Sequence, residues 1–114
     1  DKDKIEIAHH AGDLLAIAEN TLYEQSKDEY YQFFADRPEA DNVNQYTGVY
    51  FREELTKFEE FVEKVKAFDK PMAVYVFSWG EAEFDEYFED SNTISVKPIP
   101  QPILEIYKSI YNLG

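Results

Sequence analysis

Hydrophobic and polar positions give the first half of the chain the pattern of one helix followed by strands. The segment Ile5–Gly12 predicts a short helix, because its glycine suits the left-handed position that ends a helix. Apolar or aromatic stretches of strand length follow, separated by polar turns. These stretches are Leu14–Ala18, Thr21–Gln25 (which extends the first or forms the next strand), Tyr30–Phe34 and Tyr46–Phe51. We therefore expect a helix and an antiparallel hairpin or meander here.

The second half begins with helical periodicity. An apolar stripe at i, i+3, i+7 and i+10 predicts an amphipathic helix of about four turns. Its members are Leu55, Phe58, Val62 and Val65. The helix has two candidate starts: Glu53 and Glu54 suit a first turn, whereas Thr56–Glu59 fits a capping box.

Strands and helices then alternate to the end of the chain. Met72–Phe77 and Thr93–Val96 predict strands, Ser78–Glu81 fits a capping box that opens a short helix, and Ile103–Tyr111 predicts a last helix. An alternation of β-α-β-α-β-α implies parallel neighbours. We therefore expect residues 1–114 to form one α/β layered domain with a mixed sheet, antiparallel in its N-terminal part.

Composition excludes several classes of function without identifying one. The 114 residues hold 11 Lys and Arg against 24 Asp and Glu, a net charge of −13. This charge argues against binding nucleic acid through the chain's overall field. The absence of cysteine excludes disulfides, thiolate metal sites and a cysteine nucleophile, and it fits a reducing cytoplasm. No apolar run approaches the 18 residues of a membrane span. We expect an acidic, cytoplasmic domain without a membrane partner.

One strand-to-helix loop is a weak candidate for a ligand crevice. Ser78, Trp79 and Gly80 lie where helix N–H groups converge in open α/β sheets. The loop looks like a degraded F-x-G-x-G, the S-adenosylmethionine loop of methyltransferases. It keeps a single glycine, however, and Trp79 stands where such a loop needs a small residue. A capped helix start with a packed tryptophan is the favoured interpretation.

Other candidate chemistry is weaker still. Asp36–Glu39 is similar to a D-P-P-Y tetrad but lacks the second proline and the aromatic residue. His9, His10 and Asp13 include potential metal ligands, yet adjacent histidines point about 100° apart on a helix. The six carboxylates within Glu81–Asp90 have no basic residue among them, which favours a solvated helix face. We predict no metal site and no catalytic residue.

Four segments carry a family resemblance: Ala11–Thr21, Tyr50–Glu53, Pro71–Gly80 and Ile94–Lys108. The third contains a "YVFS" strand, and the fourth reads K-P-I-P-x-x-I-L-E-x-Y-K. Together they resemble the far C-terminal part of site-specific DNA methyltransferases, namely the adenine-specific modification subunits of type III-like restriction–modification systems.

The resemblance implies a non-catalytic C-terminal domain excised from a larger enzyme. Neither the cofactor loop nor the D-P-P-Y tetrad is present, so no catalytic or cofactor-binding residue transfers to this chain. S-adenosylmethionine is implied for the parent enzyme alone. The implied partners are the remainder of the methyltransferase, a second subunit or the restriction subunit. The implied roles are structural support, subunit association or partner docking, without direct binding of nucleic acid.

Two other classes of function remain open. One is an independent acidic interaction module, for example a DNA-mimicking antirestriction protein, since −13 on this size copies a run of phosphates. Such mimicry needs carboxylates in two rows along one elongated face. The other is a small enzyme that uses the Ser78–Glu81 crevice, which a ligand bound there would favour.

Aromatic side chains in the N-terminal strands suggest an interaction surface. Alternation sends Tyr31 and Phe33 to one side of the sheet and Tyr30 and Phe34 to the other. If one set lacks cover from the chain's own helices, it forms an exposed apolar patch of roughly 400 Å² or more. The alternative is that helices pack both faces, as in a doubly wound sheet. The residues proposed for this surface are Tyr30, Tyr31, Phe33, Phe34, Tyr46 and Tyr50.

Overall fold

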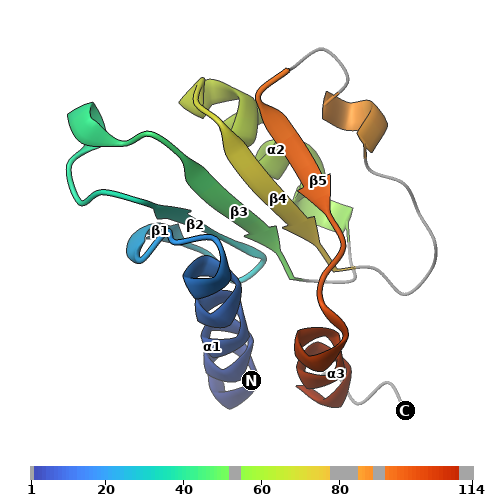
Figure 1. Ribbon diagram of the computed structural model, residues 1–114. Helices are drawn as coiled ribbons and strands as arrows, with labels where there is room; N and C mark the ends of the chain where they lie inside the picture. The colour runs from blue at the N-terminus through green and yellow to red at the C-terminus, as the bar shows by residue number, and fades with distance from the viewer. Residues whose placement is uncertain (1, 52–54, 78–84, 89–91, 111–114) are drawn as a thin grey trace.

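A five-stranded mixed sheet, in the order β1-β2-β3-β4-β5, organises the chain (Figure 1). The computed structural model describes residues 2–51, 55–77, 85–88 and 92–110. The strands are β1 (Tyr23–Lys27), β2 (Tyr31–Ala35), β3 (Tyr46–Tyr50), β4 (Met72–Val76) and β5 (Ile94–Lys97). The α-helices are α1 (Lys2–Ala18), α2 (Phe58–Phe68) and α3 (Gln101–Ile110), and three short 3₁₀ turns are η1 (Ala40–Asn42), η2 (Leu55–Lys57) and η3 (Asp85–Phe88).

The strand directions change once, at β3. β1, β2 and β3 pair antiparallel, whereas β3, β4 and β5 pair parallel. A short turn joins β1 to β2, and a longer loop that contains η1 joins β2 to β3. The connection from β3 to β4 runs through α2, because a parallel neighbour needs a long crossover. The predicted fold class, an α/β domain with an N-terminal meander and a mixed sheet, is confirmed.

Helices cover both faces of the sheet (Figure 1). Alternation along β2 places Tyr31 and Phe33 in the cluster under α2, and Phe34 in the opposite cluster under α1 and α3. β3 and β4 divide their side chains in the same way. β2 and β3 are therefore buried at every position, and most of their side chains are apolar or aromatic, with Gln32 and Thr47 as buried polar exceptions.

The prediction for the first 18 residues is right about a helix at Ile5–Gly12 and wrong about a strand at Leu14–Ala18. Both segments belong to the single helix α1. Gly12 does not end the helix and has no positive φ. The residue in the left-handed position is Asn20, with φ 61°, and Thr21 N–H donates to Ala16 O at 2.9 Å to close the helix end.

The start of α2 also differs from the sequence prediction. The 3₁₀ turn η2 precedes the helix, and Lys57 occupies the N-cap position without a side-chain cap. The Thr56–Glu59 capping box is therefore not formed. The buried face of α2 matches the predicted stripe, with Phe58, Val62 and Val65 packed on the sheet, and Phe61 joins them. None of the helices in the described ranges combines the length and the apolarity needed to cross a membrane.

Candidate functional site

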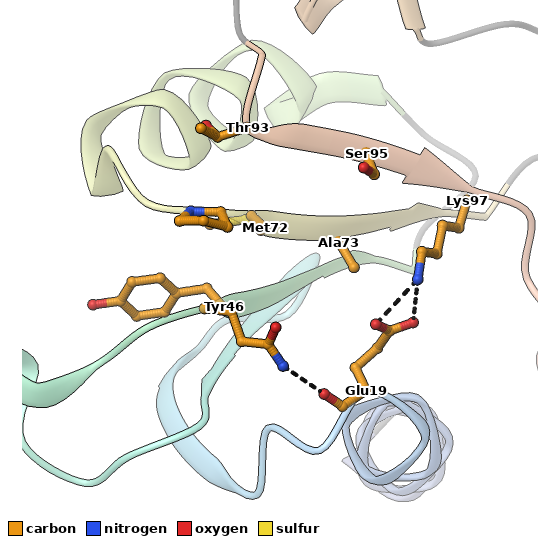
Figure 2. Close-up of a pocket in the computed structure, with 9 residues that line it drawn as sticks. Glu19, Tyr46, Met72, Ala73, Thr93, Ser95 and Lys97 are labelled. Carbon is orange, nitrogen blue, oxygen red and sulfur yellow. Dashed lines mark hydrogen bonds and ion pairs between the residues drawn. The ribbon is translucent and has the colours of Figure 1, made fainter.

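Three polar side chains from distant segments meet beside the end of α1. Lys97 Nζ, at the end of β5, lies 2.9 and 3.2 Å from the two carboxylate oxygens of Glu19 (Figure 2). The Tyr75 hydroxyl of β4 donates a hydrogen bond to the same carboxylate. We call Glu19, Tyr75 and Lys97 the Glu19 cluster. It joins the end of α1 to two parallel strands.

Burial and hydrogen bonding shift the proton equilibria of the Glu19 cluster. Burial alone would raise the pKa of Glu19, but the Tyr75 and Lys97 bonds outweigh it and hold the pKa below its ordinary value of 4.5. The pKa of Tyr75 is raised, first by burial and then by its bond to the Glu19 carboxylate. The stable forms are therefore the Glu19 carboxylate and the neutral Tyr75 phenol.

A hollow of about 170 Å³ opens next to the Glu19 cluster, near the beginnings of β3, β4 and β5 (Figure 2). The residues that line it are Glu19, Gln45, Tyr46, Pro71, Met72, Ala73, Thr93, Ser95 and Lys97. Gln45 Nε2 also donates to the Glu19 carbonyl oxygen at 2.9 Å. Ligand sites of open α/β sheets lie instead at the carboxyl ends of the parallel strands.

The hydrogen bonds and the ion pair of the Glu19 cluster indicate a structural role and not a catalytic one. A nucleophile needs a base within hydrogen-bonding reach, and a general base needs a pKa near the working pH. Here the carboxylate has a lowered pKa and is bonded to Tyr75 and Lys97. The cluster stabilises the position of α1 on the sheet, and its carboxylate is not suited to act as a general base near neutral pH.

Glu19→Gln is expected to lower the free energy of unfolding at pH 7 by about 1–2 kcal/mol, because it removes a charged acceptor from Tyr75 and Lys97. A carboxyl whose folded pKa is depressed stabilises the fold above its unfolded pKa, and this stabilisation is lost as pH falls through the folded pKa. The difference in stability between the two proteins should therefore shrink below about pH 4.5. Urea unfolding of both proteins at several pH values measures this difference in stability. A difference that does not change with pH would contradict the pairing of the Glu19 carboxylate with Tyr75 and Lys97.

The aromatic interaction surface predicted from sequence is wrong, because most of its members belong to the core. Phe33, Phe34 and Tyr50 are 0–2% exposed, and Tyr31 and Tyr46 are also buried. α2 covers Tyr31 and Phe33, while α1 and α3 cover Phe34. Tyr30, just before β2, packs on the α2 side and not with Phe34 as alternation predicts. In the described part of the chain, neither set forms an exposed patch.

Two tyrosines of the predicted surface have specific partners on the α2 side. The Tyr31 hydroxyl donates to the Glu60 carboxylate, and its pKa is raised by burial and by that bond. Tyr30 is half-buried, with Lys57 Nζ 5.3 Å from its ring centre. These contacts stabilise the layer between sheet and helix.

The two histidines of α1 have structural environments. His9 is buried, its Nε2 lies 2.9 Å from the Asp28 carbonyl oxygen, and its ring meets the edge of Phe51. His10 is exposed and lies 3.8 Å from the Asp13 carboxylate. Among the residues that the structure describes, no group of three or more His, Asp or Glu side chains is arranged to hold a metal ion.

The Asp36–Glu39 segment is part of a loop that Asp36 organises. Its carboxylate accepts hydrogen bonds from the backbone N–H groups of Asn44 at 2.9 Å and Gln45 at 3.3 Å. These bonds outweigh burial and lower the pKa of Asp36. These hydrogen bonds stabilise the loop that connects β2 to β3.

The crevice candidate Ser78, Trp79 and Gly80 lies outside the described residues, as do most of the carboxylates within 81–90. Phe77, just before the crevice, is buried. Comparison with protein-family models, with curated proteins and with solved structures finds no match to this chain.

Proposed function

We propose that this chain is the non-catalytic C-terminal domain of a site-specific adenine DNA methyltransferase of a restriction–modification system. Its role is to support the catalytic part of that enzyme and to dock a subunit or partner. S-adenosylmethionine and the catalytic tetrad belong to the rest of the parent enzyme.

The observation that supports this proposal is that all four segments of the family resemblance pack together. Tyr107, from the Ile94–Lys108 segment, is fully buried between Phe51 and Phe77, with ring centres 6.3 and 5.6 Å away. The Glu19 cluster connects the Ala11–Thr21 segment to the Pro71–Gly80 segment through Tyr75 and to the Ile94–Lys108 segment through Lys97. The four segments thus contact one another on the α1/α3 side of the sheet, and their Tyr50, Met72 and Val74 face α2.

The coding sequence adjoining this chain provides the first test. We expect an F-x-G-x-G-type cofactor loop and a D-P-P-Y tetrad in the same reading frame upstream. Deletion of residues 1–114 from that longer protein should leave S-adenosylmethionine binding intact in calorimetry. It should also change the number of subunits per particle that light scattering measures. An isolated 114-codon frame would refute the proposal and favour the independent acidic module.

The 114-residue chain alone is expected to bind no S-adenosylmethionine. The strand-to-helix loop predicted from the sequence after Phe77 has one glycine, Gly80, and the bulky Trp79 beside it. Calorimetric titration with the cofactor should give only heats of dilution. A micromolar site would contradict this expectation.

Duplex DNA is also expected not to bind at physiological salt. The net charge is −13, and four basic side chains of the described part lie within 4 Å of a carboxylate. These are Arg37, Lys57, Lys97 and Lys108. Phosphate binding needs clustered, available Lys and Arg. Fluorescence anisotropy of a labelled duplex measures this; saturable, salt-sensitive binding would overturn the expectation.

A further inference from the structure

Helix α1 carries its large apolar side chains on the outside of the domain. Ile7, Leu14 and Ile17 are 47%, 46% and 57% exposed. The buried side of the helix consists mostly of small residues, with Leu15 and His9 as its large members. The buried small residues are Ala8, Ala11, Gly12 and Ala16. A surface helix normally has the reverse arrangement, with large apolar residues toward the core.

The exposed residues form one continuous stripe along the helix. Ile7, His10, Leu14 and Ile17 follow the spacing i, i+3, i+7 and i+10, which is the a/d seam of a helix that packs against another helix. We call these four residues the outer stripe. Leu22 and Tyr23 are also exposed, so five of the six exposed large hydrophobic residues of the described part lie between residues 7 and 23.

Charge indicates what kind of helix fits the outer stripe. Glu6 and Asp13, both exposed and seven residues apart, border the stripe on one side. A second copy of this chain would bring another net charge of −13 to the same contact. A helix with Lys or Arg beside its apolar residues would instead pair with Glu6 and Asp13.

We infer that the outer stripe of α1 is a docking surface for an amphipathic helix of a partner, with Leu- or Ile-type residues against the stripe and Lys or Arg at its border. The inference goes beyond the proposed function, because it depends only on the exposure, spacing and charge of α1. It holds or fails whether or not the parent is a methyltransferase.

The test uses two synthetic peptides of about 20 residues, long enough for five helical turns. Both carry Leu at the a and d positions; one has Lys at e and g, and the other has Glu. Calorimetry with the whole chain should show binding of the Lys peptide and none of the Glu peptide. Amide shifts in ¹⁵N spectra should map binding to α1.

Variants locate the contact and control for unfolding. Leu14→Asn with Ile17→Asn should weaken binding of the Lys peptide about tenfold or more, while Tyr87→Asn, at another exposed aromatic, leaves it unchanged. Glu6→Gln with Asp13→Asn should reduce the preference for Lys over Glu. Circular dichroism should show that all variants remain folded, because the substituted side chains are exposed.

Three results would overturn the inference. Equal affinity for the two peptides would show that Glu6 and Asp13 do not select a basic partner. Amide shifts confined to elements other than α1 would place the contact elsewhere. Light scattering that finds a dimer of this chain, dissociated by Leu14→Asn, would identify a second copy as the occupant instead.

Discussion

Phe34→Ala is expected to lower the free energy of unfolding by about 3–5 kcal/mol, the cost of emptying a buried phenylalanine site. Phe34 is 2% exposed and lies in the cluster that α1 and α3 form on the sheet. Small domains have total stabilities of about 5–15 kcal/mol, so this single change removes a large fraction. Urea denaturation followed by circular dichroism measures the loss.

Tyr23→Ala is the matched control for the Phe34 substitution. Tyr23 is an aromatic residue on the neighbouring strand β1, but it is 45% exposed. Its replacement should change the stability by about 1 kcal/mol or less. If Phe34→Ala instead kept full stability and altered only the oligomeric state, Phe34 would be a docking residue and the packing described here would be wrong.

The sheet could be predicted from sequence because strand signals are local. The aromatic stretches, the amphipathic stripe of α2 and the alternation after it predicted the strand directions correctly. The error in α1 had a further consequence. Leu14–Ala18 belongs to a helix that, together with α3, covers Phe34, one of the aromatic residues predicted from the sequence to form a surface.

The Glu19 cluster could not be predicted, because its members are far apart in the chain. Tyr75 is 56 residues from Glu19, and Lys97 is 78 residues away. No spacing rule connects such positions; only the parallel order of β4 and β5 beside α1 brings them together.

The position of Gly12 shows why a glycine can mislead a helix assignment. A Cβ atom at this position would lie 2.0 Å from Gln32 Oε1 and 3.0 Å from its Cδ. Gln32 is fully buried in β2, and its Nε2 donates to His9 O and to Glu24, each at 3.4 Å. Glycine therefore leaves room here for the Gln32 side chain where α1 approaches the sheet, and it does not serve a left-handed backbone.

Gly12→Ala is consequently expected to destabilise the protein by about 2 kcal/mol, although alanine favours a helix by about 1 kcal/mol over glycine. Gln32 must move to admit the methyl group, and its buried amide then loses its partners. In a Gln32→Ala background the clash is gone, so Gly12→Ala should become neutral or stabilising. Urea unfolding of the four proteins gives the coupling energy, expected at about 2–3 kcal/mol. A Gly12→Ala protein more stable than the original would show that α1 does not approach β2 so closely.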